Sequence, residues 1–330
     1  PAERFVRIDD ILINSTGAGT AGRIAQICNL PCDTIVDGHM IIIRANDKVS
    51  QKYLGYAMKA HQWEVLQLDE GSTGQTELNR ERLLDEIMIS YPTSFSLQEM
   101  VVKTLEGIDQ KLLINEKVND NLQQQAAALF SSLYDRSNTE VRFTDLIQIL
   151  GGGTPKTGEN TYWNGNIAFF TPKDVGIPYT LITEKTISKE GLSHCNSRLY
   201  PVNTVFVTAR GTVGKVGMSG VPMAMNQSCY ALVGKETHQL LVYFYTLKAV
   251  DRLKHKASGA VFDAITTRDF ESEQIMKLSD DDATAFLRVA EPMFQEVLNN
   301  NIENLRLSTL RDSLLPKLMS GEIDVSAVQL

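Results

Sequence analysis

The sequence predicts an α+β protein in which two repeated α+β domains are separated by two long antiparallel coiled-coil helices. Two observations carry this prediction. Residues 96–134 and 280–318 both have a helical pattern and align with each other at a shift of 185 residues. The segment ahead of each helix also repeats, with apolar runs, glycine turns and a short helix. We therefore divide the chain into segments 1–95, 96–136, 137–279 and 280–330.

Both long helices carry apolar residues at alternating spacings of four and three, which is the spacing of a coiled-coil seam. Each seam is interrupted at the same place by two asparagines, Asn115 and Asn119 in the first helix and Asn300 and Asn304 in the second. A displaced seam asparagine would lie unpaired among apolar neighbours, so such residues fix the helix register. The match predicts that the asparagine layers face each other; two unrelated helices with solvent-facing asparagines are the alternative. Pro292 either kinks the second helix or marks its first turn.

The two α+β domains repeat one order of elements. Residues 10–23 and 203–215 each predict a strand and a glycine turn that ends in a basic residue. About 66 residues lie between the first long helix and Asn203, against 9 ahead of Asp10, so the first domain is expected to lack its N-terminal half. The elements that follow are a strand, a short helix and a Ser-Gly turn, at 39–44, 53–61 and 72–74 in the first domain and at 227–233, 240–253 and 258–259 in the second.

Composition and charge restrict the class of protein. No apolar run approaches the roughly 18 residues of a membrane span, and no basic stretch leads into an apolar one at the N-terminus, so we expect a cytoplasmic protein without a membrane partner. The net charge of −8 argues against a simple nucleic-acid binder. Residues 141–277, however, carry 15 Lys and Arg against 11 Asp and Glu, which leaves 17 against 29 elsewhere. Their densest basic cluster, residues 252–256, fits a solvated helix end as well as a DNA contact.

Motifs for metal and nucleotide chemistry are incomplete. Cys28 and Cys32 are close enough for metal ligands, but no second Cys or His pair follows, so no metal site is expected. Residues 17–22 satisfy the dinucleotide-binding glycine pattern, yet residues 23–29 read as a strand where that pattern needs a helix. Pro155 replaces the glycine that a phosphate loop needs before its lysine. We therefore expect no catalytic residue and no cofactor on this chain.

Four stretches together resemble the specificity subunits of Type I restriction-modification systems. Residues 10–23 and 204–229 are similar to the middle of a target-recognition domain, residues 151–174 to the opening of one, and residues 310–322 to the end of the family's distal conserved helix. The resemblance assigns 1–95 to the C-terminal half of a first target-recognition domain and 137–279 to a second. Residues 96–136 and 280–330 would then be the central and distal conserved helices, the latter with a tail.

The same resemblance implies the function and the partners. The two domains would each read one half of a split site in double-stranded DNA, and the long helices would set the spacing between the halves. The helices would also dock methyltransferase (M) subunits, through which restriction/translocase (R) subunits join the complex. S-adenosylmethionine and ATP are then expected only on these partner subunits.

A DNA-recognition surface needs basic residues for phosphates and polar side chains for base edges. The glycine turns would let backbone N–H groups approach phosphate beside a basic residue, although an ordinary hairpin turn with an exposed base is the alternative. Asn226 and Gln227 are candidate bidentate adenine readers, or else solvated or capping residues. With the polar loop that follows the glycine run, the candidate DNA contacts are Arg23, Thr154, Lys156, Thr157, Arg210, Lys215, Asn226 and Gln227.

Two other classes of protein stay open. A coiled-coil adaptor that does not bind DNA would keep the long helices and show no basic face on either α+β domain. A nucleotide-dependent α/β enzyme would need a strand, turn and helix at the glycines, and a two-stranded arrangement at Arg23 excludes it.

Overall fold

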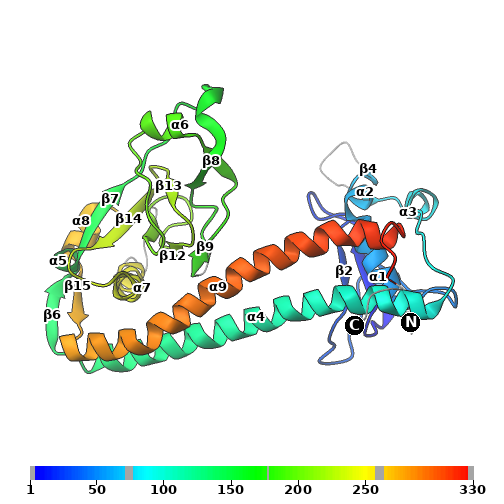
Figure 1. The fold of residues 1–330 in the computed structure, drawn as a ribbon, viewed down its shortest axis with the longest axis horizontal. Coiled ribbons are helices and arrows are strands. Elements are labelled where there is room, and N and C mark those ends of the chain that lie inside the picture. The colour runs from blue at the N-terminus through cyan, green and yellow to red at the C-terminus, as the bar shows by residue number, and fades with distance from the viewer. Residues whose placement is uncertain (1–3, 71–76, 177, 257–263, 326–330) are drawn as a thin grey trace. The chain divides into compact units, whose positions relative to one another are not determined.

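The computed structural model describes residues 4–70, 77–176, 178–256 and 264–325. The chain divides into two compact units, shown in Figure 1: a first unit of residues 1–114 and 305–330, and a second unit of residues 115–304. The Ser-Gly turns predicted at 72–74 and 258–259 lie outside the described residues. No helix in the described part of the chain is long and apolar enough to cross a bilayer.

The first unit is built on a sheet with the strand order β2-β1-β3, in which β1 is antiparallel to both neighbours. Alternating burial forms its core: Ile11 and Ile13 of β1 are fully buried, as are Tyr53 of the following helix and Leu105 of the first long helix. The elements of this unit are β1 (Ile11–Asn14), β2 (Ile24–Gln26), β3 (Met40–Ile43), α1 (Gln51–Ala60), α2 (Gln62–Leu66), β4 (Asp69–Glu70), β5 (Glu77–Leu78) and α3 (Arg80–Glu86).

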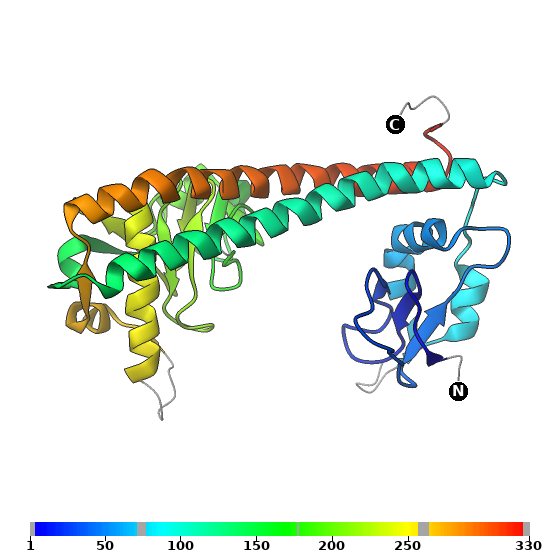
Figure 2. The same cartoon turned by 90° about the horizontal axis from the view of Figure 1, so that it is seen from below.

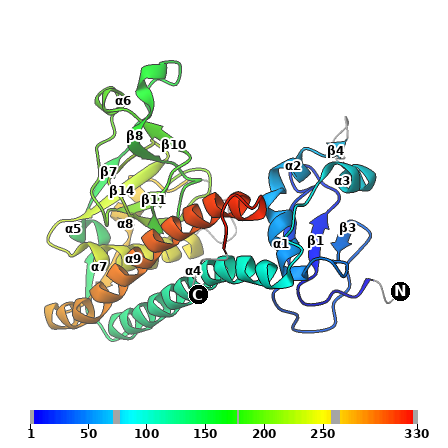
Figure 3. The ribbon, with the colours of Figure 1, turned by 45° about the vertical axis from the view of Figure 1, so that its right-hand side comes forward.

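The second unit has a larger sheet with the order β7-β14-β11-β12-β9, a second sheet with the order β10-β8-β13, and a β15-β6 pair. Figure 3 shows α6 beside β8 and β10. The elements are β6 (Thr139–Arg142), α5 (Phe143–Leu146), β7 (Ile147–Gly151), the 3-10 helix Asn160–Tyr162, β8 (Trp163–Phe170), β9 (Tyr179–Thr180), β10 (Lys185–Ile187), α6 (Lys189–Ser193), β11 (Val205–Thr208), β12 (Val216–Ser219), β13 (Met223–Met225), β14 (Cys229–Gly234), α7 (Gln239–Lys256), α8 (Thr267–Ser272) and β15 (Gln274–Lys277).

The two long helices are α4 (Phe95–Asp135) and α9 (Asp280–Met319). Within each unit their segments lie side by side and run in opposite directions (Figure 2). In the second unit an aromatic cluster holds them to α7: the ring of Phe244 lies 4.9 Å from that of Phe130 and 5.1 Å from that of Phe286. Pro292 lies well inside α9, so the suggestion that it marks the first turn was wrong.

The units share one frame, in which β2-β1-β3 of the first corresponds to β12-β11-β14 of the second. The glycine turns match bond for bond. Asn14 N donates to Arg23 O at 3.1 Å, and Thr208 N donates to Lys215 O at 3.0 Å. Gly22 and Gly214 close these turns with φ angles of 80° and 75°, a region that glycine adopts without strain. The predicted fold class is therefore confirmed, and so is the strand after Gly22, which leaves no helix for a dinucleotide.

Candidate nucleic-acid interface

Three loops of the second unit meet beside the ends of β7, β11 and β13. Gly153 N, after β7, donates to Met225 O of β13 at 3.0 Å. Ala209 N, after β11, donates to Ser228 O at 2.8 Å. The short turn at 226–228 therefore lies between the loop at 152–157 and the turn at 209–214. Their exposed polar residues form what we call the loop surface: Thr154, Lys156, Thr157, Arg210, Thr212 and Gln227.

The glycine run at 151–153 allows the first of these contacts. A Cβ atom on Gly152 would lie 2.2 Å from Asn226 O, so only glycine lets the two backbones approach this closely. The approach brings Thr154 to Gln227, and the threonine hydroxyl donates a hydrogen bond to the amide oxygen of Gln227. Both side chains are exposed, so the structure joins two candidates 73 residues apart on one surface.

The side chain of Asn226 bonds within its own turn, unlike that of Gln227. Its Oδ1 accepts a hydrogen bond from Ser228 N at 3.0 Å, and its backbone N–H donates to Phe170 O at 2.9 Å. In the first unit, Asp37 Oδ1 accepts from His39 N at 2.9 Å in the same manner. The side chain at this position therefore closes the turn in both units, which is the capping alternative for an Asn at a strand start.

The basic candidates lie at different places. Arg210 is exposed, and its backbone N–H bonds Ser228 O at 3.2 Å, which puts it on the loop surface. Lys215 is exposed at the other end of the same turn, where neighbouring Gly214 packs against Val250 and Lys254 of α7. Arg23 is exposed at the corresponding turn of the first unit.

The sequence missed the loop at 171–174 as part of this surface. Thr212 Oγ1 donates to Pro172 O at 3.2 Å, so this loop borders the turn at 209–214. Asp174 holds it in shape by accepting hydrogen bonds from Thr171 N at 2.8 Å and Oγ1 at 2.6 Å. Lys173 keeps 80% of its side chain exposed, with its Nζ 3.7 Å from the carboxylate of Glu184. The Thr-Pro-Lys-Asp pattern, in which the acid lies three residues after the threonine, was the signal for such a turn.

The basic cluster at the end of α7 is partly used inside the domain. Glu273 is fully buried and pairs with Arg252, whose Nε lies 2.8 Å from its carboxylate, and with Lys256. Two of the charges that suggested a DNA contact thus compensate a buried carboxylate. Sequence spacing could not show this pairing, because Glu273 reaches α7 only through the tertiary fold.

Cysteine chemistry is not part of the loop surface. Cys229, at the start of β14, is buried, and burial together with the charge of Asp174 raises the pKa of its thiol to about 12. It therefore stays protonated and unreactive at neutral pH. Cys28 and Cys32 are exposed, and the described residues contain no cluster of three His, Cys, Asp or Glu side chains placed to hold a metal ion.

The seam asparagines come together in the second unit. Asn115 Nδ2 donates to Asn304 Oδ1 at 2.8 Å, and Asn300 Nδ2 donates to Asn119 Oδ1 at 2.9 Å. Asn119 Nδ2 also donates to Asn301 Oδ1 at 2.8 Å. The predicted contact between the two layers is therefore present, while their role in fixing the register stays a prediction.

Residues 136–277, which include the whole loop surface, match the family described as the Type I restriction modification DNA specificity domain. These residues are similar to that family, and they make up less than half of the chain. We call residues 136–277, which run from just ahead of β6 to the end of β15, the specificity domain. It contains every candidate DNA contact except Arg23.

Known relatives agree with this assignment. The chain is 28% identical to the Type I restriction enzyme HindI specificity subunit of Haemophilus influenzae over 186 residues, which are 54% of this chain and 40% of the relative. It is 29% identical over 127 residues to the MjaIX specificity subunit of Methanocaldococcus jannaschii, or 37% of this chain and 29% of the relative. The chain thus spans less than half the length of these relatives.

A solved structure agrees at the level of the fold. The crystal structure of a Type I restriction-modification S subunit from M. genitalium superposes with a TM-score of 0.61 at 15% identity, covering 96% of this chain and 84% of that one. The likeness extends beyond the specificity domain to the first unit and the long helices.

Proposed function

We propose that the chain is the sequence-specific DNA-recognition subunit of a Type I restriction-modification complex. The observation that carries the proposal is the loop surface, because it gathers exposed polar and basic residues at one place in a DNA specificity domain. In this proposal the specificity domain reads one half of a bipartite site in double-stranded DNA and the first unit contacts the other half. The chain itself is not catalytic.

Gln227 is the residue we assign to base reading. A glutamine reads adenine by accepting from its amino group and donating to N7, which requires an amide held in one orientation. The hydrogen bond from Thr154 occupies one lone pair of the Gln227 oxygen and leaves a second lone pair and the whole NH₂ group for a base. Asn226 is less suited, because its oxygen already closes the turn.

The basic residues around Gln227 would contact phosphates. Lys156 and Arg210 belong to the loop surface, and Lys173 and Lys215 lie on loops that continue it. Such contacts position a protein on DNA without reading sequence and make its affinity depend on salt.

The long helices are the proposed docking elements for the methyltransferase subunits, and the restriction subunits would join through these. Large apolar side chains exposed on α4 support a docking role, with Leu113 49% and Ile114 54% exposed. S-adenosylmethionine and ATP would then be held by the partner subunits, and the methyl transfer and cleavage would be theirs.

The test compares two variants of the chain, assembled with its methyltransferase, on cognate and scrambled duplexes at several salt concentrations. Genome-wide mapping of methylated adenine first identifies the cognate site. Gln227→Ala is expected to lose about 1–3 kcal/mol on the cognate duplex with little change on scrambled DNA. Lys215→Ala should weaken both and lower the salt slope by about one unit. Gln148→Ala, an exposed glutamine of β7 away from the loop surface, is the matched control.

Equal losses for Gln227→Ala on both duplexes would remove it from the base-reading set. No DNA binding by the assembled complex would favour the adaptor alternative. Methyl transfer or cleavage by the purified chain alone would contradict the non-catalytic assignment.

A further inference from the structure

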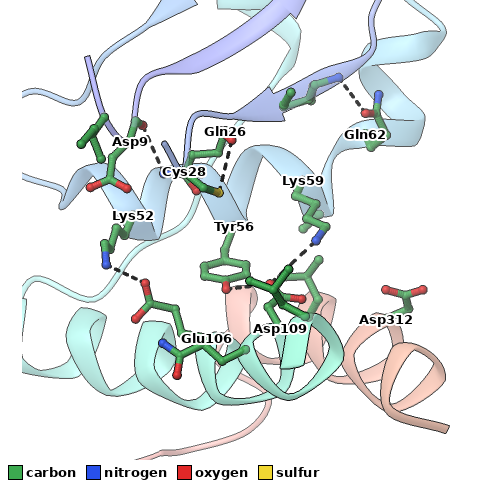
Figure 4. A pocket seen from close by; sticks show the side chains of 18 of the residues that line it. Asp9, Gln26, Cys28, Lys52, Tyr56, Lys59, Gln62, Glu106, Asp109 and Asp312 are labelled. Atoms are coloured by element: carbon green, nitrogen blue, oxygen red, sulfur yellow. Dashed lines mark hydrogen bonds and ion pairs between the residues drawn. The ribbon is translucent and has the colours of Figure 1, made fainter. Parts of the chain in front are cut away.

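The first unit contains a cavity of about 990 Å³ beside β2. As Figure 4 shows, its walls come from the strand β2, from α1 and from the two long helices, and the labelled side chains that reach it include Asp9, Gln26, Lys52 and Asp109. None of the DNA-binding candidates lines it.

The second unit has a hollow of only about 90 Å³ at the equivalent place. Asp9 and Asn203 correspond, since each precedes the central strand with φ near 68° and 69°. On the long helices, Glu106 and Gln110 line the cavity where Glu291 and Gln295, 185 residues later, line the hollow. The two spaces are therefore one feature of the shared frame, open in the first unit and nearly closed in the second.

A strand with a tyrosine closes the hollow of the second unit. β9 runs parallel to β12, and Met218 N donates to Pro178 O at 2.6 Å. The hydroxyl of Tyr179 then donates to Asn203 Oδ1 at 3.0 Å. Its ring lies 6.5 Å from the ring of Phe294 on α9.

Smaller or more polar side chains keep the space open in the first unit. Gln51 and Gln239 correspond, because each amide Nε2 donates to an equivalent strand carbonyl, Ile43 O at 3.2 Å and Leu232 O at 2.7 Å. Ile43 and Leu232 are equivalent since they pair with the first residues of β1 and β11. Counting from this pair, Gly55 stands where the second unit has Tyr243, and the side chain of Gln26 lies against this glycine, since a Cβ on Gly55 would be 2.2 Å from Gln26 Oε1. At the 185-residue shift, the position of Phe294 is taken by Asp109 in the first unit.

The outer edge of β2 is also open at Gln26. In an antiparallel ladder, alternate residues of a strand bond to one neighbour and the residues between them point their N–H groups to the other side. The residues of β1 that bond to β2 are Asp10, Leu12 and Asn14, so the N–H groups of Ile24 and Gln26 point away from β1. Ile24 N–H is taken up by the side chain of Gln62 at 2.9 Å. Gln26 corresponds to Met218, whose N–H bonds the β9 segment, and no strand among the described residues pairs with this edge of β2.

We propose that this edge and cavity bind an extended polypeptide strand that runs parallel to β2 and presents a tyrosine to Asp9. The strand would accept a hydrogen bond from Gln26 N–H, as Pro178 does from Met218. The tyrosine hydroxyl would donate to the carboxylate of Asp9 in place of the amide of Asn203, and hydrogen bonds to a charged acceptor are the stronger kind. Addition of a strand to an open edge is a general mode of peptide recognition.

The probe is a fluorescein-labelled peptide with the sequence of residues 174–184, which contains the β9 strand, titrated into the whole chain and followed by anisotropy. The second unit's own place is already filled by β9, so the signal reports the first unit. We expect saturable binding. Replacing the peptide tyrosine by phenylalanine should weaken it about tenfold, the effect of one hydrogen bond to a charged group.

Two variants of the chain test the partner of that hydroxyl. Asp9→Gly, which suits the positive φ, should weaken the tyrosine peptide about tenfold and leave the phenylalanine peptide unchanged, while Asp9→Asn should lose less than about threefold. Hydrogen exchange of the Gln26 amide should slow when the peptide is bound, while that of Ile24, already bonded to Gln62, should not.

Three results would overturn the proposal: no saturable binding, equal effects of Asp9→Gly on both peptides, or unchanged exchange of the Gln26 amide. Self-association that protects the Gln26 amide without peptide would instead assign the edge to a second copy of the chain. The experiment involves no DNA, so its failure is distinct from failure of the proposed function.

Discussion

Asn119 links the two long helices of the second unit through both ends of its amide. Its oxygen accepts from Asn300 and its nitrogen donates to Asn301. Asn119→Leu removes both bonds and leaves the amide of Asn300, which is only 6% exposed, facing an apolar side chain. An unsatisfied buried polar group costs about 1–3 kcal/mol, and the half-buried Asn301 adds less, so we expect a loss of about 2 kcal/mol.

The double variant Asn119→Leu/Asn300→Leu separates polar pairing from packing. Replacing both partners by apolar side chains of similar size removes the unsatisfied group, so we expect it to recover to within about 1 kcal/mol of the parent. Asn121→Leu, at an exposed position of the same helix, is the matched control and should change stability by less than about 0.5 kcal/mol.

Urea unfolding followed by tryptophan fluorescence measures these differences. The chain has two tryptophans, Trp63 in the first unit and Trp163 in the second, so a Trp63→Phe background makes the signal report the second unit. A comparison of midpoints at constant slope gives the change in unfolding free energy. A neutral Asn119→Leu, or a double variant whose loss equals the sum of the single losses, would refute the reasoning.

Two further predictions concern buried carboxylates. Burial raises the pKa of Asp10, but the hydrogen bonds from the Arg44 side chain and the Arg7 N–H, together with the charges of both arginines, outweigh it and hold the pKa below its ordinary value of 3.8. This stabilisation is complete above the pKa of Asp10 in the unfolded chain and is lost as the pH falls through its pKa in the folded chain. The difference in unfolding free energy between the parent and Asp10→Asn should therefore shrink below about pH 4. A difference that grows in acid would contradict this prediction. For Glu273, alanine at both Arg252 and Lys256 should cost about 3–5 kcal/mol because the carboxylate stays buried and unpaired. Glu273→Gln should cost less, because Arg252 and Lys256 are 43% and 56% exposed and can be hydrated when the carboxylate is gone. A lower unfolding temperature for Glu273→Gln than for the double alanine variant would refute this prediction.

The sequence was informative where the determinants of structure are local or periodic. The four-three spacing and the paired asparagines predicted the antiparallel contact of α4 and α9, because a seam residue is defined by positions on one helix. The glycine turns at Gly22 and Gly214 were predicted from the repeat, and the structure gives both a positive φ. The segments predicted from the sequence begin and end with the long helices, so they describe secondary-structure elements. The compact units instead divide each long helix between them: Leu105 of α4 belongs to the core of the first unit and Phe130 to that of the second.

Contacts between distant segments were beyond sequence reasoning. The hydrogen bond between Thr154 and Gln227 depends on how β7 and β13 are placed, and nothing in either segment specifies that placement. The pairing of Glu273 with the end of α7 is of the same kind. The cavity of the first unit could not be predicted from the sequence, because it depends on Gly55 and Asp109, which lie on different helices, and on an edge of β2 with which no described strand pairs.

The shared frame shows how one fold can carry different side chains at equivalent positions. The hydrogen bonds that close each turn involve the backbone and one capping side chain, so neighbouring residues are free to differ. Asp37 matches Asn226, so Gly38 of the first unit takes the position of Gln227. Thr16 takes the position of Arg210, because each forms an isolated bridge to a later segment, Thr16 with Glu77 and Arg210 with Ala264. A glycine has no side chain with which to read a base. If both units contact DNA, they must therefore read their half-sites with side chains at different positions of the same frame, which makes the two halves of the proposed site independent in sequence.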